Sequence, residues 1–353
     1  MDEGRLRTIL EGFERVNVLV VGDFFLDKYM VMDRALSEVS LETGLEAYQV
    51  VEVRRSPGAA GTVTSNLRAL DVEVTALGVI GNDGEGYELK RGLLQQGAHT
   101  EPLIEQDDLF TPTYTKPLMR ELDGGEHEIN RLDIKNRTPL PPSVEEQIVE
   151  RLRSYVPQME GVIIADQVQE RNCGVITERV REEIARLARQ HPYIVFAADS
   201  RARIGLFREV IIKPNEREAT LALHPDHSGQ IDLAMAWESG RELFHRNRKP
   251  VFVTVGEKGI LLFTEQGEER VPAVEVTGEI DIVGAGDSVT AAIVASLCSG
   301  AEPQEAALVG NLVASITIQQ IGSTGTASRQ QVFERFRSLP PSCRLWQNHS
   351  GRQ

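Results

Sequence analysis

Short apolar runs recur along the chain, and most of them end at a glycine or a polar residue. The first covers residues 16–21 and ends at Gly22 and Asp23. A continuous apolar run of this length is typical of a strand that is buried on both faces of a parallel sheet. We therefore expect a strand here and at further runs over residues 74–80, 161–165, 193–198, 210–212 and 250–255.

Amphipathic stretches separate most of these runs, as at residues 144–153 and 175–189. Strands that alternate with amphipathic helices predict an α/β fold, in which a mostly parallel sheet carries helices on both faces. Ligands of such sheets bind beyond the carboxyl ends of the strands. The candidate site residues are therefore those that follow the runs: Asp23, Asp27, Gly81, Asp83, Asp166, Asp199, Asn215 and Gly256.

Two stretches break the alternation. Residues 46–53 and 111–134 contain alternating and β-branched positions without an intervening helix, and the second holds a turn at residues 123–125. This pattern predicts a small antiparallel appendage. Such a flap could close over a ligand and exclude water, or it could be a surface hairpin without a function. Its exposed strand edges would need a cover.

A glycine-rich turn precedes one helical run. Residues 281–287 read Asp-Ile-Val-Gly-Ala-Gly-Asp, and an apolar helical run follows over 288–297. Free backbone N–H groups and the positive end of the helix dipole can hold an anion at such a turn. Asp287 could then take a proton from a hydroxyl that attacks a bound phosphate. The alternative is that Asp287 caps a buried helix.

The composition narrows the classes of function. The chain has 353 residues with 41% hydrophobic content, enough for a substantial core, and a formal charge of −15 that argues against a nucleic-acid partner. It has no apolar run near the roughly 20 residues of a membrane span, and its start does not resemble a signal peptide. Its cysteines are few and far apart, so we expect a protein of the reducing cytoplasm: Cys173, Cys298 and Cys343.

Two other glycine-rich segments could also bind phosphate groups. Residues 56–63 open a helix with small residues that would let a ligand approach the backbone. Residues 78–86 lack the G-x-G-x-x-G spacing of a dinucleotide-binding loop, and no G-x-x-x-x-G-K-[ST] loop occurs. A Rossmann dehydrogenase and a kinase of the P-loop class are therefore disfavoured.

Several motifs together carry a family resemblance. Residues 281–287 resemble a D-T-x-G-A-G-D signature in which Ile282 replaces the threonine. Residues 78–97 resemble a G-x-[VI]-G-x-D-x-x-G stretch, residues 213–218 an N-x-x-E motif, and residues 254–259 a T-x-G-x-x-G loop. These motifs, in this order, resemble the PfkB (ribokinase-like) carbohydrate kinases over nearly the whole chain. The resemblance implies a three-layer α/β/α fold with a mostly parallel central sheet and a small β-sheet lid.

The resemblance also implies an organisation of the chain. We expect a single kinase domain over residues 1–340, lid segments at about 28–55 and 109–135, and a C-terminal tail at 341–353. The family further implies a homodimer that forms through the lids.

One branch of the family resembles the chain more closely. Residues 18–29 look like the opening of the heptose 7-phosphate kinases of ADP-heptose synthesis, as do residues 113–116, 131–133 and 322–326. The chain departs from that branch at Ala59 and Thr62, where a glycine and an asparagine are usual, and at 167–170, where a tyrosine and a lysine are missing. These departures lie near the expected sugar site, so they leave the substrate open.

The resemblance assigns roles to individual residues. Asp287 is the expected catalytic base, with Gly284, Ala285 and Gly286 as the anion hole for the transferred phosphoryl group. Asp27 matches the family's ligand for the sugar hydroxyls, and it could instead cap a turn at a strand end. The other expected substrate contacts are Gly58, Ala59, Thr62, Asp166 and Lys116.

Nucleotide and metal roles follow in the same way. Asn215 and Glu218 would hold Mg²⁺, mostly through water, or they would cap a helix after Pro214. Asp281 resembles a monovalent-cation site, which makes K⁺ a candidate cofactor beside ATP and Mg²⁺. The expected nucleotide contacts are Asn215, Thr254, Gly256, Gly259 and Asn311, the last of which could instead be a satisfied polar residue of a helix.

Some alternatives stay open at this point. Asp166 and Asp199 could contact sugar or metal-bound water, or they could cap helices. If the substrate carries a phosphate, the flap cations Lys116, Arg120 and Arg131 could meet it, or they could be solvated charges. The expected activity is ATP-dependent phosphorylation of a sugar or sugar phosphate such as heptose 7-phosphate, fructose or ribose. The alternative is a non-catalytic sugar or nucleotide sensor on the same fold.

Overall fold

The computed structural model describes residues 1–322 and 324–340 and is built around one large sheet. Its strands are β1 (Asn17–Gly22), β4 (Glu73–Leu77), β10 (Gly161–Asp166), β11 (Val195–Ser200), β12 (Ile211–Ile212), β13 (Val251–Thr254), β14 (Ile260–Thr264) and β15 (Gly267–Val271). Their order is β15-β14-β13-β12-β11-β10-β1-β4. The pairs from β4 to β13 are parallel, whereas β14 and β15 add an antiparallel edge that the sequence pattern did not predict.

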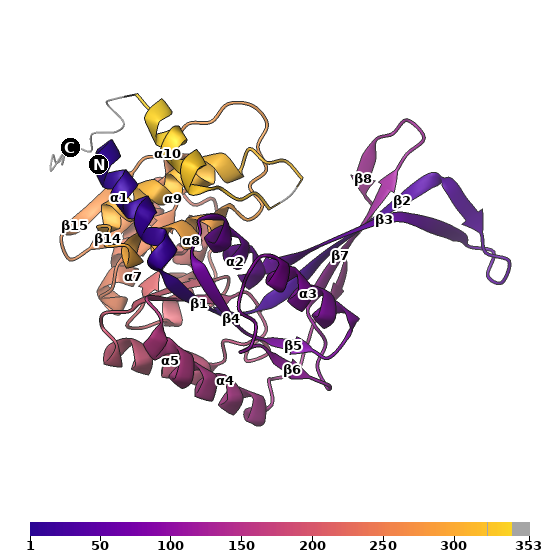
Figure 1. Cartoon of the computed structure of the whole chain (residues 1–353), viewed down its shortest axis with the longest axis horizontal. Helices are drawn as coiled ribbons and strands as arrows, with labels where there is room; N and C mark the ends of the chain where they lie inside the picture. Colours follow the sequence, from indigo (N-terminus) through magenta and orange to yellow (C-terminus); the bar gives the residue numbers. More distant parts are fainter. Residues whose placement is uncertain (323, 341–353) are drawn as a thin grey trace.

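Helices cover both faces of this sheet, as Figure 1 shows. One layer consists of α1 (Glu3–Gly12), α2 (Ala60–Ala69), α3 (Gly84–Gln95), α8 (Ala285–Cys298), α9 (Pro303–Thr317) and α10 (Arg329–Ser338). The other consists of α4 (Pro142–Tyr155), α5 (Glu178–Gln190), α6 (Glu216–Leu223) and α7 (Leu233–Asn247). Short 3₁₀ helices lie at Phe13–Arg15, Val156–Gln158, Ile204–Leu206 and Gly256–Lys258.

The central strands bury both of their faces, which explains their continuous apolar sequence. In β1, Val18 and Val20 pack into the cluster under α8, whereas Leu19 and Val21 pack into the cluster under α4 and α5. Successive side chains of a strand point to opposite faces, so one run supplies two cores. The expected three-layer α/β/α architecture with a mostly parallel sheet is confirmed.

A second sheet forms the lid and projects from the body in Figure 1. It contains β2 (Phe24–Val39), β3 (Glu46–Ala59), β7 (Thr113–Arg120), β8 (Glu126–Glu128) and β9 (Leu132–Ile134). Strand β2 is antiparallel to β3, and β7 is antiparallel to β8 and β9, as expected for an antiparallel appendage. The pairing of β2 with β7 is parallel, which the pattern did not predict. Strand β2 begins shortly after β1, and β3 ends directly before α2, so both long strands reach from the body into the lid and extend beyond the expected segments.

The remaining strands form a small parallel pair, β5 (Val79–Gly81) and β6 (Ile104–Gln106). The tail expected at 341–353 lies outside the described residues, as does Ser323 in the segment 322–326. Within the described part of the chain, no helix is both long enough and apolar enough to span a membrane.

Candidate active site

The Gly-Ala-Gly turn begins helix α8. Gly284 is the N-cap residue at φ +79°, and the helix starts at Ala285. Asp287 is therefore not the cap, and its carboxylate accepts no hydrogen bond from any residue that the structure describes. The structure excludes the capping alternative for Asp287 and leaves its carboxylate available for chemistry.

The backbone N–H groups of this turn differ in whether they donate a hydrogen bond within the protein. The N–H of Ala285 donates to the carbonyl of Ile282 at 3.1 Å, so it is not free for an anion as we expected. The amides of Gly286 and Asp287 donate to no backbone carbonyl among the described residues. These two amides stand in the first turn of a 14-residue helix, where the dipole favours negative charge. The anion-binding part of the turn is thus shifted toward the helix.

The surroundings of Asp287 tune its acidity. Burial and the charge of Asp199 raise the pKa of Asp287 to about 7, and the positive charges of Lys213 and Arg201 oppose this rise. Asp199 ends β11 in the sheet next to β12, so the sheet itself places the second carboxylate near the first. A carboxylate with a pKa near neutrality is suited to general-base catalysis.

Lys213 is a further candidate site residue, one that the sequence pattern did not indicate. It is buried, and its ammonium group forms an ion pair of 2.9 Å with Asp199. A Cβ atom added to Gly286 would lie 3.6 Å from Nζ of Lys213, so this cation stands directly beside the turn. Lysine is seldom fully buried without a partner. Its position between β12 and the N-x-x-E motif was the available signal.

Asp27 occupies the lid side of the site. It lies in β2 opposite Ser56 of β3, and burial raises the pKa of its carboxyl against the opposing charges of Lys116 and Arg131. A Cβ atom on Gly58 would lie 2.3 Å from Oδ2 of Asp27. Only glycine at position 58 leaves room for this carboxylate.

The starts of α2 and α8 meet at the two residues that depart from the heptose kinase branch. Ala59 precedes α2 with φ +54° and ψ −114°, a conformation that glycine adopts far more easily. The methyl group of Thr62 would lie 3.3 Å from a Cβ atom on Gly284. Thr62 is buried and packs against the Gly-Ala-Gly turn at residues 284–286, which is called the anion turn below.

The expected magnesium residues form a helix cap. The side chain of Asn215 accepts from the N–H of Glu218 at 2.8 Å, and Glu218 Oε2 accepts from the N–H of Asn215 at 2.9 Å. This capping box is the alternative stated above. The capping box also holds Glu218 in place. Burial and the charge of Asp199 raise the pKa of Glu218 to about 7, although the charge of Lys213 opposes this rise. In the described part of the chain, no group of three or more acidic, histidine or cysteine side chains could hold a metal directly.

The expected nucleotide loop lies next to this cap. The N–H of Thr254 donates to the carbonyl of Pro214 at 2.9 Å, and Thr254 pairs with Asn215. Gly256 has φ +57° and Gly259 has φ +95°. A Cβ atom on Gly259 would lie 2.1 Å from the carbonyl oxygen of Val271, so packing alone already requires this glycine.

Two expected ligands have structural partners instead. Asn311 Nδ2 donates to the carbonyls of Val271 at 3.1 Å and Pro272 at 2.8 Å, so the alternative of a satisfied helix residue fits better than an adenine contact. Asp166 accepts from Ser200 Oγ at 2.5 Å and from Nε of Arg203 at 3.1 Å. Asp166 is thus tied to Ser200 and Arg203, and its contact with the sugar stays a prediction.

Asp281 also has backbone partners. Its Oδ1 accepts from the N–H of Val283 at 3.0 Å, and its Oδ2 accepts from the N–H of Gly322 at 3.2 Å. The carboxylate thereby joins the turn before α8 to the segment after α9. Any cation at Asp281 would share the carboxylate with these two amides.

The flap cations expected to meet a substrate phosphate have partners as well. Arg120 pairs with Glu126 at 2.9 Å, and Arg131 pairs with Asp133 at 2.7 Å. Lys116 donates to the hydroxyl of Tyr29 at 3.2 Å and lies 4.9 Å from the centre of that ring, while its charge reaches Asp27. Of the three, Lys116 lies nearest to the expected sugar ligand.

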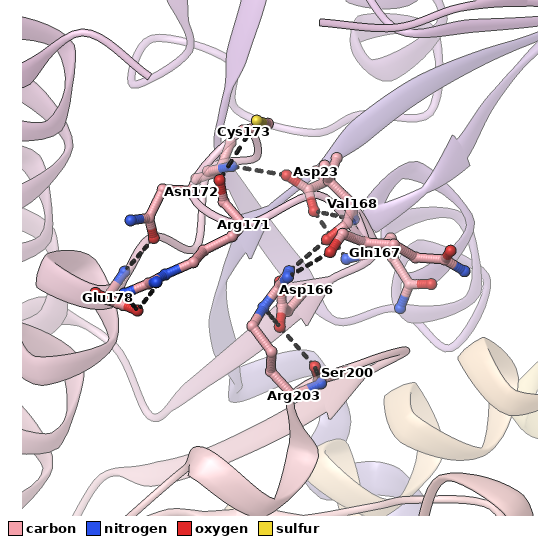
Figure 2. A network of polar contacts seen from close by, with 12 residues as sticks. Asp23, Asp166, Gln167, Val168, Arg171, Asn172, Cys173, Glu178, Ser200 and Arg203 are labelled. Carbon is pink, nitrogen blue, oxygen red and sulfur yellow. Dashed lines mark hydrogen bonds and ion pairs between the residues drawn. The ribbon is translucent and has the colours of Figure 1, made fainter. Parts of the chain in front are cut away.

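A buried carboxylate holds the segment that follows β10 (Figure 2). Asp23 accepts hydrogen bonds of 2.8 Å from the backbone N–H groups of Gln167, Val168 and Val175. Residues 167–170 are those that differ from the heptose kinase branch, and they line an open pocket of ≈ 400 Å³ beneath the lid. Asp23 therefore sets the shape of one wall of this pocket.

Comparison with known proteins gives a consistent picture. The chain is 27% identical over 331 residues to the bifunctional protein HldE of Desulfatibacillum aliphaticivorans. This alignment covers 93% of the present chain and 64% of that protein. It is 29% identical over 332 residues to the HldE of Wolinella succinogenes, with 94% and 66% covered. The chain thus spans about two thirds of the length of these relatives.

Solved structures show the same fold. A ribokinase of Arabidopsis thaliana complexed with ribose and ATP aligns with a TM-score of 0.65 at 17% identity, over 91% of this chain and 98% of the other. Phosphofructokinase-2 from Escherichia coli in complex with fructose-6-phosphate aligns with a TM-score of 0.66 at 17% identity, over 90% and 97%. These identities are low, so the likeness concerns the fold, which is ribokinase-like.

The family of this chain follows from a match that covers most of its length. The pattern of the pfkB family carbohydrate kinases matches residues 24–330. This span includes the lid, Asp27, the capping box and the turn before α8. The chain therefore belongs to the pfkB family of carbohydrate kinases, and it is a phosphotransferase with an alcohol group as acceptor.

Proposed function

We propose that this chain transfers the γ-phosphate of ATP to a hydroxyl group of a sugar or sugar phosphate, with Asp287 as the catalytic base. One observation carries the proposal: an unengaged carboxylate with a pKa near 7 stands in the first turn of α8, beside two free amides and the ammonium of Lys213. The carboxylate would take the hydroxyl proton while the amides and the ammonium bind the transferred phosphoryl group.

The same geometry supports ATP and Mg²⁺ as cofactors. Glu218 presents a carboxylate near Asp199 that the capping box holds in place, and a hydrated Mg²⁺ needs only such oxygen ligands. The ion would neutralise charge on the phosphates of ATP. The loop at Thr254 and Gly256 adjoins Asn215 and would line the nucleotide phosphates. K⁺ at Asp281 is a further part of the proposal.

Heptose 7-phosphate is the first acceptor to test, because the motifs of this chain resemble the heptose 7-phosphate kinases. Fructose and ribose are the next candidates, since Ala59, Thr62 and residues 167–170 depart from that branch near the pocket. Asp27 would bind sugar hydroxyls in either case.

The test is a screen for ADP release with ATP, Mg²⁺ and a panel of sugars and sugar phosphates. The proposal predicts turnover with at least one acceptor that is well above ATP hydrolysis alone. Nucleotide and sugar binding without turnover on any acceptor would favour the alternative, a non-catalytic sensor. The carboxylate of Asp287 argues against that alternative. Its raised pKa means that its ionised form is disfavoured, and a binding protein does not require such a group.

We further propose that residues 1–340 act as one kinase domain in the cytoplasm and that two copies associate through their lids. Several large apolar side chains of the lid are exposed, which supports such an association. Their exposed fractions are 68% for Val39, 103% for Leu41 and 70% for Leu45 at the end of the β2–β3 hairpin.

A further inference from the structure

The pocket beneath the lid has a charged rim that the proposed function does not explain. It is open to solvent, and the space within it, open solvent included, is ≈ 400 Å³. Three parts of the chain form it: the lid strands, residues 135–136 after the lid, and the segment 167–173. Its lining includes Phe25, Tyr114, Lys135, Glu170, Cys173 and Arg201.

Arg201 and Lys135 are the cations of this lining. Arg201 forms no ion pair with any residue that the structure describes, and Lys135 only lies 5.7 Å from the centre of the Tyr114 ring. Most other arginines near the site are neutralised, as Arg131 is by Asp133 and Arg203 by Asp166. Because neither side chain has an ion-pair partner among the described residues, both positive charges remain available to an anion.

One carboxylate faces these cations. Glu170 also lines the pocket, and its charge contributes to the raised pKa of Cys173, after the larger effect of burial. The pocket therefore holds two positive side chains and one negative side chain. This excess of positive charge favours an anion, and a phosphate monoester carries up to two negative charges with oxygen acceptors for both cations.

The pocket adjoins Asp27 of the candidate site. Phe25 lines it, and Asp27 lies two residues further along β2, on the same face of the strand. Tyr114 of β7 is the register partner of Asp27. The charge of Arg201 also acts on Asp287, although burial dominates there. One acceptor molecule could therefore place a hydroxyl at Asp287 and a second group between Arg201 and Lys135.

We propose that this lid pocket binds the phosphate group of an acceptor that is already phosphorylated, with Arg201 and Lys135 as its ligands. The inference rests on the proposed sugar kinase activity and narrows its substrate class to sugar phosphates. Arg201 directly follows β11 and Lys135 directly follows β9, so each cation lies at the end of a strand. Binding of phosphate would bring the lid and the segment 167–173 together around the acceptor.

The kinetic test compares each sugar with its own phosphate: fructose with fructose 6-phosphate, and sedoheptulose with sedoheptulose 7-phosphate. We expect the preferred acceptor to be a phosphorylated member. For that acceptor, Arg201→Gln should raise KM at least about tenfold and leave KM for ATP unchanged, because a hydrogen bond to a charged group is lost. An equal rise in KM for ATP would assign Arg201 to the nucleotide and overturn the proposal, as would a preference for the neutral sugars.

Two further variants test whether the charge of the pocket controls KM for the phosphorylated acceptor. Glu170→Gln removes the opposing charge and should lower KM for the phosphorylated acceptor. Arg171→Gln is the matched control: it lies on the same segment, its side chain is 78% exposed, and it pairs with Glu178 away from the pocket. This control should behave as the wild type. A rise in KM for Glu170→Gln would contradict the proposed charge balance.

A binding test separates the pocket from the activity. With AMP-PNP and Mg²⁺ bound, inorganic phosphate should slow alkylation of Cys173, read by mass spectrometry of its peptide, relative to sodium chloride of equal ionic strength. The double variant Arg201→Gln/Lys135→Gln should lose this protection. Protection without turnover on any sugar would refute the kinase proposal and support the pocket, whereas absence of protection in the wild type would refute the pocket.

Discussion

Ala59 shows how a single residue can carry strain at this site. It joins β3 to α2 with φ +54° and ψ −114°, and the next residue, Ala60, donates its N–H to the carbonyl of Asp23. An alanine in this conformation costs about 1–3 kcal/mol. The start of α2 and the anion turn are therefore held at a cost in stability.

We predict that Ala59→Gly stabilises the protein. Glycine adopts the observed backbone angles without a clash, and after its own loss of backbone entropy the net gain should be about 1 kcal/mol in the free energy of unfolding. Urea denaturation measures it. The matched control is Ala60→Gly in the first turn of α2, which should destabilise by up to about 1 kcal/mol. A loss of stability for Ala59→Gly would show that position 59 is not strained.

The raised pKa of Asp287 predicts a dependence of activity on pH. The base works only when ionised, so kcat/KM should rise with pH and level off above a pKa of about 7, which burial and the charge of Asp199 produce. Asp199→Asn removes that charge and frees Lys213, so both effects should shift the limb to lower pH. A shift to higher pH would contradict the assignment. Asp226→Asn, at an exposed position, is the control.

Residue roles were predictable where chemistry and local position coincide. Asp287 follows a glycine turn before a helix, and Asp27 matches a family motif, so both could be named from the sequence. Asn311 and Asp166 could not be judged in this way, because their partners are the carbonyls of Val271 and Pro272 and the side chain of Arg203. These partners are brought close only by the fold.

At the scale of elements, the segment after β10 depends on one buried side chain. Asp23 ends β1 and accepts from three amides of this segment, which keeps one wall of the lid pocket in place. Burial and the charge of Asp166 raise the pKa of Asp23 to about 6, while the amides oppose the rise. Near neutral pH and above, the carboxylate is ionised and can accept all three bonds.

We predict that Asp23→Asn loosens this segment. The amide retains one acceptor oxygen and turns an NH₂ group toward a backbone N–H, so at least one buried donor loses its partner at a cost of about 1–3 kcal/mol. Hydrogen exchange should accelerate for the amides of Gln167, Val168 and Val175, whereas Asp226→Asn should change nothing. Unaltered protection of the three amides would mean that the segment is held by other contacts.

The elements themselves were partly predictable. The parallel strands of the body could be located because each buries two apolar faces, and α4, α5 and α8 because of their helical patterns. The parallel pairing of β2 with β7 could not, since it joins residues 87 positions apart, such as Leu26 and Thr113, and no local pattern marks the partner strand. The edge strand β15 lacks a continuous apolar run because it is largely exposed. Strand β14 is apolar and buried, but its antiparallel pairing is not visible in the sequence.

At the scale of the whole molecule, the lid determines both the acceptor site and the proposed dimer. We predict that Val39→Asp/Leu45→Asp converts a dimer into a monomer in sedimentation velocity, because two charges would enter the apolar contact at the hairpin end. Leu94→Asp is the control, as Leu94 is 53% exposed on helix α3 of the body. A wild-type monomer, or a double variant that remains dimeric, would contradict association through the lids.

All three scales meet at Asp287: the fold places its free carboxylate in the first turn of α8, and we propose that this carboxylate is the base of a sugar kinase. The most direct test is kcat of Asp287→Asn with the best acceptor of the screen, together with its affinity for AMP-PNP. We predict that kcat falls roughly 10²–10⁴-fold while nucleotide affinity stays at the wild-type value. A variant that binds nucleotide and turns over within about tenfold of the wild-type rate would contradict the claim.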